Sequence, residues 1–210
     1  MNLSHLNMIY GNIEISSRER VLTQDFNLTN SSLKSTSIES QYAQGNITLD
    51  SNKFDGGRFY SRYHGASLVT WQKPYEISGT VTFTNNTFEN NARIEINQHK
   101  LNTITINNNQ FKNNSGGIYI EPHWAVTYGA NYMKKPADVE IKGNTFTKDR
   151  GGVFIQAGRF VVTDNNFIES PGIRYKGIYY PDAYYQRFQK GFFDFKINNN
   201  TFCRQKGQNG

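Results

Sequence analysis

The stretch from Val81 to Phe88, VTFTNNTF, decides the fold, because modified copies of it recur along nearly the whole chain. Aligned on their last residue, the copies end at Leu33, Phe54, Phe88, Phe111, Phe146, Phe167 and Phe202. Two apolar columns precede this one, as at Val81 and Phe83, with polar or β-branched residues such as Thr82 between them. This alternation is typical of a half-buried β-strand.

A column rich in asparagine lies two residues before the end of each copy and predicts a turn, because Asn tolerates the left-handed backbone region. Its members are Ser31, Asn52, Asn86, Asn109, Asn144, Asn165 and Asn200. Stacking the copies at the strand spacing of about 4.8 Å places Phe on Phe and Asn amide on Asn amide. We therefore expect an all-β protein, a single-stranded parallel β-helix of about seven to eight rungs, right-handed by the usual crossover rule.

The uniform repeat predicts a single domain covering residues 1–210. Leu6, Met8 and Ile13 form a degenerate eighth copy, with Ile13 placed 20 residues before Leu33. The repeat begins and stops abruptly, which would expose unpaired strand edges that natural sheets avoid. We therefore expect the chain to be part of a longer polypeptide or to be capped by partner subunits, for example in a homotrimer.

The composition indicates a polyanionic partner. The formal net charge is +6 and the pI about 9.3, which favours acidic polysaccharide. Nucleic acid is disfavoured, because Lys and Arg are spread out and no known binding motif occurs. No apolar run approaches the length of a membrane span, and the N-terminus lacks a signal-peptide profile. The single Cys203 excludes an internal disulfide framework.

The columns and the Asn turn resemble the pectate-lyase-like superfamily of β-helices, over roughly Leu6 to Phe202. The resemblance implies that the strand following each Asn turn lines a substrate groove. Three insertions follow this strand, at residues 63–78, 122–138 and 175–191. They are rich in Tyr and Trp, including Trp71 and Trp124, and aromatic side chains are typical of a sugar-binding wall.

Alternation about the inward residues of that strand predicts its outward columns. The first reads Tyr60, Glu95, Tyr119, Phe154 and Arg174. The second reads Arg62, Asn97, Glu121, Gln156 and Lys176, and a third holds Arg58 and Arg93 followed by glycines 117, 152 and 172. A fourth, five residues beyond the inward position, reads His64, His99, His123, Gly158 and Ile178.

Three chemistries fit these columns. In β-elimination on a uronic acid, one group removes the C5 proton and Tyr119 or Tyr60 protonates the leaving oxygen. The substrate carboxylate is then neutralised by one of three side chains: Arg62, Arg93 or Asn97. In glycoside hydrolysis, Glu95 and Glu121 act as an acid/base pair, their carboxyl groups roughly 6.5–9.5 Å apart.

In the third, the histidine column holds a divalent metal ion, because imidazole is a common neutral ligand. The bland alternative is that these His and Glu side chains simply face water. No other cofactor is predicted.

We expect a carbohydrate-active β-helix that binds an acidic polysaccharide and cleaves it as a lyase or glycoside hydrolase. The catalytic candidates are Glu95, His99, Tyr119, Glu121 and His123. The substrate-binding candidates are Tyr60, Arg62, Trp71, Arg93, Asn97, Trp124, Gln156 and Arg174. The alternatives are a non-catalytic glycan-binding adhesin or spike module, and a structural fragment without a ligand.

The superfamily's own activities do not transfer directly. Its calcium-dependent pectate lyases carry several Asp on the groove sheet, and its polygalacturonases carry Asn-Thr-Asp and Gly-His-Gly motifs; this sequence has neither feature. Similar β-helices with aromatic side loops form bacteriophage tailspikes and capsule depolymerases. That resemblance implies an extracellular, cell-surface or virion-associated location.

Overall fold

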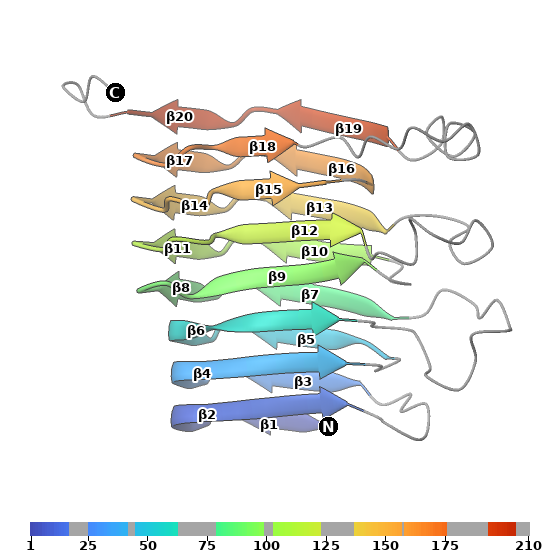
Figure 1. Cartoon of the computed structure of the whole chain (residues 1–210), viewed down its shortest axis with the longest axis vertical. Helices are drawn as coiled ribbons and strands as arrows, with labels where there is room; N and C mark the ends of the chain where they lie inside the picture. The colour runs from blue at the N-terminus through green and yellow to red at the C-terminus, as the bar shows by residue number, and fades with distance from the viewer. Residues whose placement is uncertain are drawn as a thin grey trace, which may run out of the picture.

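The computed structural model describes residues 1–16, 25–41, 45–62, 79–98, 103–122, 137–156, 158–175 and 193–204. These residues form a parallel β-helix whose coils, or rungs, are stacked along one axis (Figure 1). Each rung adds one strand to an eight-stranded sheet, called here the first sheet. Its strands are β1 (Asn2–Ser4), β3 (Phe26–Thr29), β5 (Ile47–Asp50), β7 (Thr80–Thr84), β10 (Thr103–Asn107), β13 (Asp138–Lys142), β16 (Gly158–Thr163) and β19 (Phe193–Asn198).

The second sheet has twelve strands and forks above its third strand. It starts with three long strands: β2 (Asn7–Ser16), β4 (Ser32–Gln41) and β6 (Lys53–Arg62). Strand β6 pairs with both arms of the fork. The short arm contains β8 (Thr87–Glu89), β11 (Gln110–Lys112), β14 (Thr145–Thr147), β17 (Asn166–Ile168) and β20 (Thr201–Cys203). The long arm contains β9 (Arg93–Gln98), β12 (Ile118–Pro122), β15 (Val153–Ile155) and β18 (Ile173–Tyr175).

The fork follows from the spacing of inward side chains in the sequence. Ile38 comes five positions after Leu33, and there the strand continues through one left-handed residue, Ser35, with φ 46°. Ile94 comes six positions after Phe88, and with this additional residue a turn divides the strand in two. The same coil therefore has two faces in its early rungs and three faces later.

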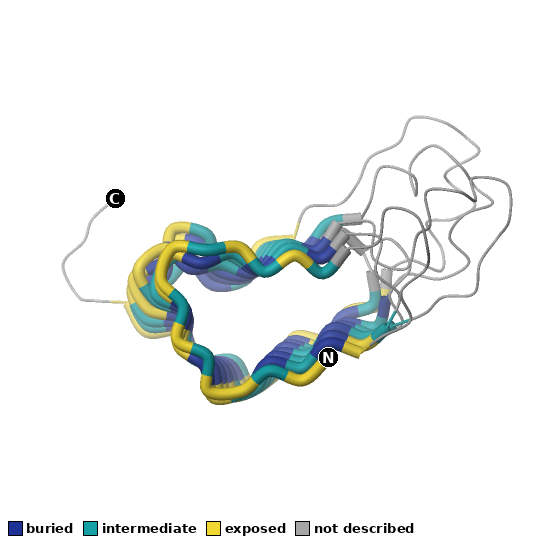
Figure 2. Tube along the Cα trace, turned by 90° about the horizontal axis from the view of Figure 1, so that it is seen from below, coloured by how far each residue is buried: buried dark blue, intermediate teal, exposed yellow. Residues whose placement is uncertain are grey.

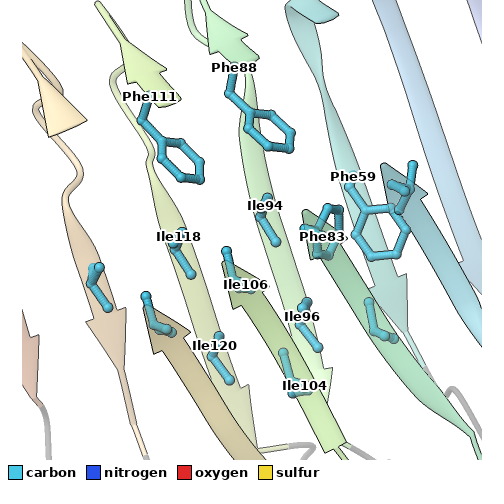
Figure 3. Close-up of a cluster of buried hydrophobic side chains, with 14 of the residues drawn as sticks. Phe59, Phe83, Phe88, Ile94, Ile96, Ile104, Ile106, Phe111, Ile118 and Ile120 are labelled. Atoms are coloured by element: carbon cyan, nitrogen blue, oxygen red, sulfur yellow. The ribbon is translucent and has the colours of Figure 1, made fainter. Parts of the chain in front are cut away.

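The core is a narrow layer between the two sheets, seen end-on in Figure 2. The phenylalanines that end the repeats stack in single file, with ring centroids 4.7–5.0 Å apart and nearly parallel planes, from Phe54 to Phe202. Beside them, Ile94 and Ile118 of the second sheet face Ile104 and Ile106 of the first (Figure 3). The predicted apolar columns are thus confirmed.

Asparagine side chains form a second continuous column at the turn. Asn109, for example, accepts hydrogen bonds at its Oδ1 from the backbone N and Nδ2 of Asn86, at 2.9 and 3.0 Å. Its own Nδ2 donates to the Oδ1 of Asn144 and to the carbonyl of Phe83. The same exchange runs along the column from Asn52 to Asn200, and it satisfies buried polar groups that would otherwise destabilise the turn.

The predicted N-terminal copy exists, but its predicted alignment is wrong. Met8 pairs with Leu33, and Ile13 pairs with Ile38 instead. Leu6 occupies the turn position where later rungs carry Asn, and its backbone N donates to the Ser31 hydroxyl. This copy lacks the Asn that marks the turn in later copies. Its apolar residues alone therefore allow Ile13 to be aligned with either Leu33 or Ile38.

A buried carboxyl group lies in the turn between β14 and β15. The Oδ1 of Asp149 accepts hydrogen bonds from the backbone N of Gly151 and Gly152, at 2.9 and 2.7 Å. Its Oδ2 and the Oδ1 of neighbouring Asn114 are both buried without a partner among the described atoms. Burial raises the pKa of Asp149, although its hydrogen bonds to Gly152, Asn114 and Gly151 oppose the shift.

The three predicted aromatic insertions lie almost wholly outside the described residues, so their prediction stays open. Only their edges are placed: Pro122 ends β12, Asp138 begins β13 and Tyr175 ends β18. Within the described ranges, the chain has no helix long and apolar enough to cross a membrane.

Candidate functional site

The outward side of the long arm carries one chemically distinct side chain per rung, as predicted. Strand pairing places Tyr60 beside Glu95, Glu95 beside Tyr119, Tyr119 beside Phe154 and Phe154 beside Arg174. The column also continues downward, because Glu39 of β4 pairs with Tyr60. We call this outward surface of β4, β6, β9, β12, β15 and β18 the groove face.

Two arginines and two glutamates form an ion cluster on the lower part of the groove face. Arg58 and Arg93 are direct neighbours on β6 and β9. The Glu95 carboxylate lies 3.0 Å from Arg93 Nη2 and 3.6 Å from Arg58 Nη1. Arg58 also reaches Glu39, at 3.4 Å. Glu95 is therefore bracketed by two guanidinium groups.

The cations of this cluster are more accessible than its anions. The side chains of Arg58 and Arg93 are 37% and 40% exposed, whereas those of Glu39 and Glu95 are 24% and 22% exposed. Each guanidinium group contacts at least one carboxylate and still has further N–H donors. The formal charges of the cluster cancel, but its arginine side chains are the more accessible to a ligand.

Aromatic rings occupy the upper part of the groove face. Tyr119 and Phe154 stack with centroids 4.7 Å apart and planes 8° apart. The Arg174 guanidinium lies 5.6 Å from the Phe154 ring centroid, and Arg58 lies 4.9 Å from that of Tyr60. Because Tyr119 and Phe154 stack along the axis, they turn their edges toward solvent. Aromatic edges are electropositive, so they complement oxygen atoms.

Tyr119 and Glu121 form the pair with the clearest acid–base character. They lie two residues apart on β12, hence on one side of the sheet. Burial raises the pKa of the Tyr119 hydroxyl, and the charge and hydrogen bond of Glu121 raise it further. The phenol consequently stays protonated at neutral pH and donates its hydrogen bond to the Glu121 carboxylate.

The structure places several other predicted residues only in part. Glu121 pairs with Asn97, and the Gln156 backbone N donates to Ile120 O at 3.0 Å. Arg62 pairs with Gln41 at the end of β6. These pairings agree with the predicted second column, while the side chains of Arg62 and Asn97 are not described.

The histidine column is not tested by the structure. His64, His99 and His123 lie outside the described residues, as do Trp71 and Trp124. The proposed metal site therefore stays a prediction. One member of that column is wrong: Gly158 begins β16 of the first sheet and does not lie on the groove face.

Three residues belong to the site although they were not selected from the sequence. Glu39 and Arg58 complete the ion cluster, and Phe154 completes the aromatic stack. Alternation about Ile38 would have placed Glu39 in the same column as Tyr60 and Glu95. The available signal was the column itself, which extends through Glu39 to Glu14 of β2, two rungs lower than expected.

Comparison with known protein families identifies one match. The model described as "Right handed beta helix region" matches residues 42–202. It covers the repeats from β5 to β20 and agrees with the expected handedness. Searches of curated proteins and of solved structures found no match.

Proposed function

Because the chain belongs to the right-handed β-helix family, whose fold is found in carbohydrate-active proteins, we propose that its groove face binds an acidic polysaccharide. The observation that carries this proposal is the pair of neighbouring arginines, Arg58 and Arg93, whose side chains are more exposed than those of the glutamates they contact. Guanidinium groups bind carboxylates by paired N–H donors, so a uronate carboxylate fits this position.

The arrangement favours a polymer that runs along the axis. Each rung offers a new outward side chain about 4.8 Å from the last. A glycan lying across the strands meets Arg58 and Arg93 first and then the edges of Tyr119 and Phe154. The exposed Arg174 provides a further positive charge at the upper end. A chain with carboxylates at intervals therefore has several contacts in sequence.

Retention on an immobilised polyuronate tests the binding proposal. The double variant Arg58→Gln, Arg93→Gln should elute at a markedly lower salt concentration than the wild type, because two charged contacts to uronate carboxylates are lost. The double variant Lys112→Gln, Lys142→Gln, at two exposed positions on β11 and β13, is the control with the same change in net charge. If the control and the arginine double variant elute alike, retention depends only on overall charge and the proposed site is wrong.

A second candidate function, cleavage by β-elimination, is favoured by the Tyr119–Glu121 contact. The Glu121 carboxylate removes the C5 proton of a uronate, the C4–O bond breaks, and a C4–C5 double bond forms. Tyr119 transfers its hydroxyl proton to the leaving oxygen. The proton on Glu121 then returns to the phenolate through their hydrogen bond, which restores both groups. The Glu95 carboxylate is instead engaged by two arginines.

Ultraviolet absorbance of unsaturated uronate products tests this chemistry. Tyr119→Phe and Glu121→Gln should each lower the rate by about 10²–10⁴-fold, which is typical for loss of a general acid or base. Tyr10→Phe, at an exposed position on the first rung, is the matched control. New reducing ends without absorbance would indicate hydrolysis, and binding without either product would leave a glycan-binding module.

A further inference from the structure

The outward side of the first sheet contains a hollow on the opposite side of the coil from the groove face. In Figure 1 the strands of the first sheet run behind those of the long arm. The hollow has a volume of about 360 Å³ and spans β10, β13, β16 and β19. That volume is within the range of roughly 300–1,000 Å³ found for small-molecule sites.

One wall of the hollow alternates hydrogen-bond acceptors and donors from rung to rung. Arg159 pairs with Asp138 on the strand below and Asp194 on the strand above. Its guanidinium makes an ion pair with Asp138. Asp194 is exposed. Carboxylates only accept hydrogen bonds and guanidinium groups only donate them, so this wall offers both functions at neighbouring positions.

The floor beside this wall is apolar. Val161 is 38% exposed although its strand, β16, is paired on both sides. It has Glu140 on the strand below and Lys196 on the strand above. Glu140 is oriented by a hydrogen bond from Asn107 Nδ2 at 2.5 Å. An apolar floor with a few oriented polar groups is the usual composition of a ligand site.

The charge of the hollow differs from that of the groove face. Three carboxylates and two cations line it, so its formal charge is −1. A polyanion is disfavoured here. A sugar hydroxyl both donates and accepts, and neighbouring ring hydroxyls match alternating donors and acceptors, while the ring C–H groups match Val161.

We propose that this hollow is a second carbohydrate site that takes an uncharged sugar residue. Asp138, Arg159 and Asp194 bind its hydroxyl groups and Val161 packs against its apolar face. The two sides of the coil then recognise different sugars, an acidic one on the groove face and a neutral one on the first sheet. The site stands on its own residues and does not require the groove face to bind.

Saturation-transfer difference NMR with neutral oligosaccharides of glucose, galactose, mannose and N-acetylhexosamine tests the proposal. At least one should show transfer to the wild type, and Val161→Arg should weaken it at least about tenfold by filling the floor. Thr48→Arg is the matched control, because it adds the same side chain on the same outward column outside the hollow. It should bind as the wild type does.

Two further results separate the possible outcomes. Asp194→Asn keeps the shape of the side chain and should weaken the same oligosaccharide several-fold, because a charged acceptor is lost. Absence of transfer with every neutral oligosaccharide would overturn the proposal, as would equal binding by Val161→Arg and Thr48→Arg. Retention of Val161→Arg on immobilised polyuronate shows that the groove face remains intact.

Discussion

Replacing Asn109 by alanine tests whether the asparagine column stabilises the coil through buried hydrogen bonds. Asn109 is 1% exposed and its side chain connects three rungs. Its removal takes the acceptor from the Asn86 backbone N and one donor from Phe83 O. Each buried polar group left unpaired costs about 1–3 kcal/mol. We expect a loss of about 2–6 kcal/mol in the free energy of unfolding.

The matched control is Asn200→Ala, in the same column at the last described rung. Asn200 accepts the corresponding hydrogen bonds from Asn165, but it is only partly buried. Water can replace its amide there, so its loss should be less than half as large. Urea unfolding followed by circular dichroism measures both as midpoint shifts at constant slope. Equal losses, or a loss below about 1 kcal/mol for Asn109→Ala, would refute the reasoning.

Three other substitutions have defined outcomes. Phe111→Ala should cost about 3–5 kcal/mol, because the ring is fully buried between two neighbours, whereas Phe202→Ala should cost under half of that since Phe202 is 59% exposed; urea midpoints compare them. Gly57→Ala should destabilise far more than Gly56→Ala. Both have positive φ, but only the Gly57 Cβ would lie 2.1 Å from Thr36 O, and similar midpoints would contradict this. Because folding raises the pKa of Asp149, protonation of this carboxyl group favours the folded state. This contribution to stability is fully present below the pKa of the unfolded chain and is lost as pH rises through the pKa of the folded protein. Asp149→Asn should therefore be more stable than the wild type at neutral pH, with an advantage that shrinks toward acid; a constant difference across pH would disprove it.

The sequence predicted the vertical columns because they depend only on the length of the repeat and on alternation. Phe88 over Phe111, Asn86 over Asn109, and Glu95 beside Tyr119 all follow from counting residues between copies. Backbone pairing then carries every neighbouring side chain into place. This part of the fold, and the order of residues along the groove face, could therefore be predicted from the sequence.

What counting could not provide is the direction in which long side chains turn. Arg58 bends toward both Glu39 and Glu95, and this choice depends on side-chain rotamers and not on register. The acid–base character of Tyr119 depends on its burial, which alternation does not specify. The hollow on the first sheet was not predicted either. It forms where the small Val161 lies between the longer side chains of Glu140 and Lys196 on the adjacent rungs.

Because adjacent rungs pair residue for residue, the number of rungs sets the length of the outer surfaces. Each rung contacts only the rung above and the rung below, so inserting a whole copy of the repeat leaves the existing contacts unchanged. Such a duplication lengthens both outer surfaces by the same step of about 4.8 Å. Proteins of this architecture can thus change the length of their binding surfaces by gaining or losing entire repeats, while the contacts within each rung stay the same.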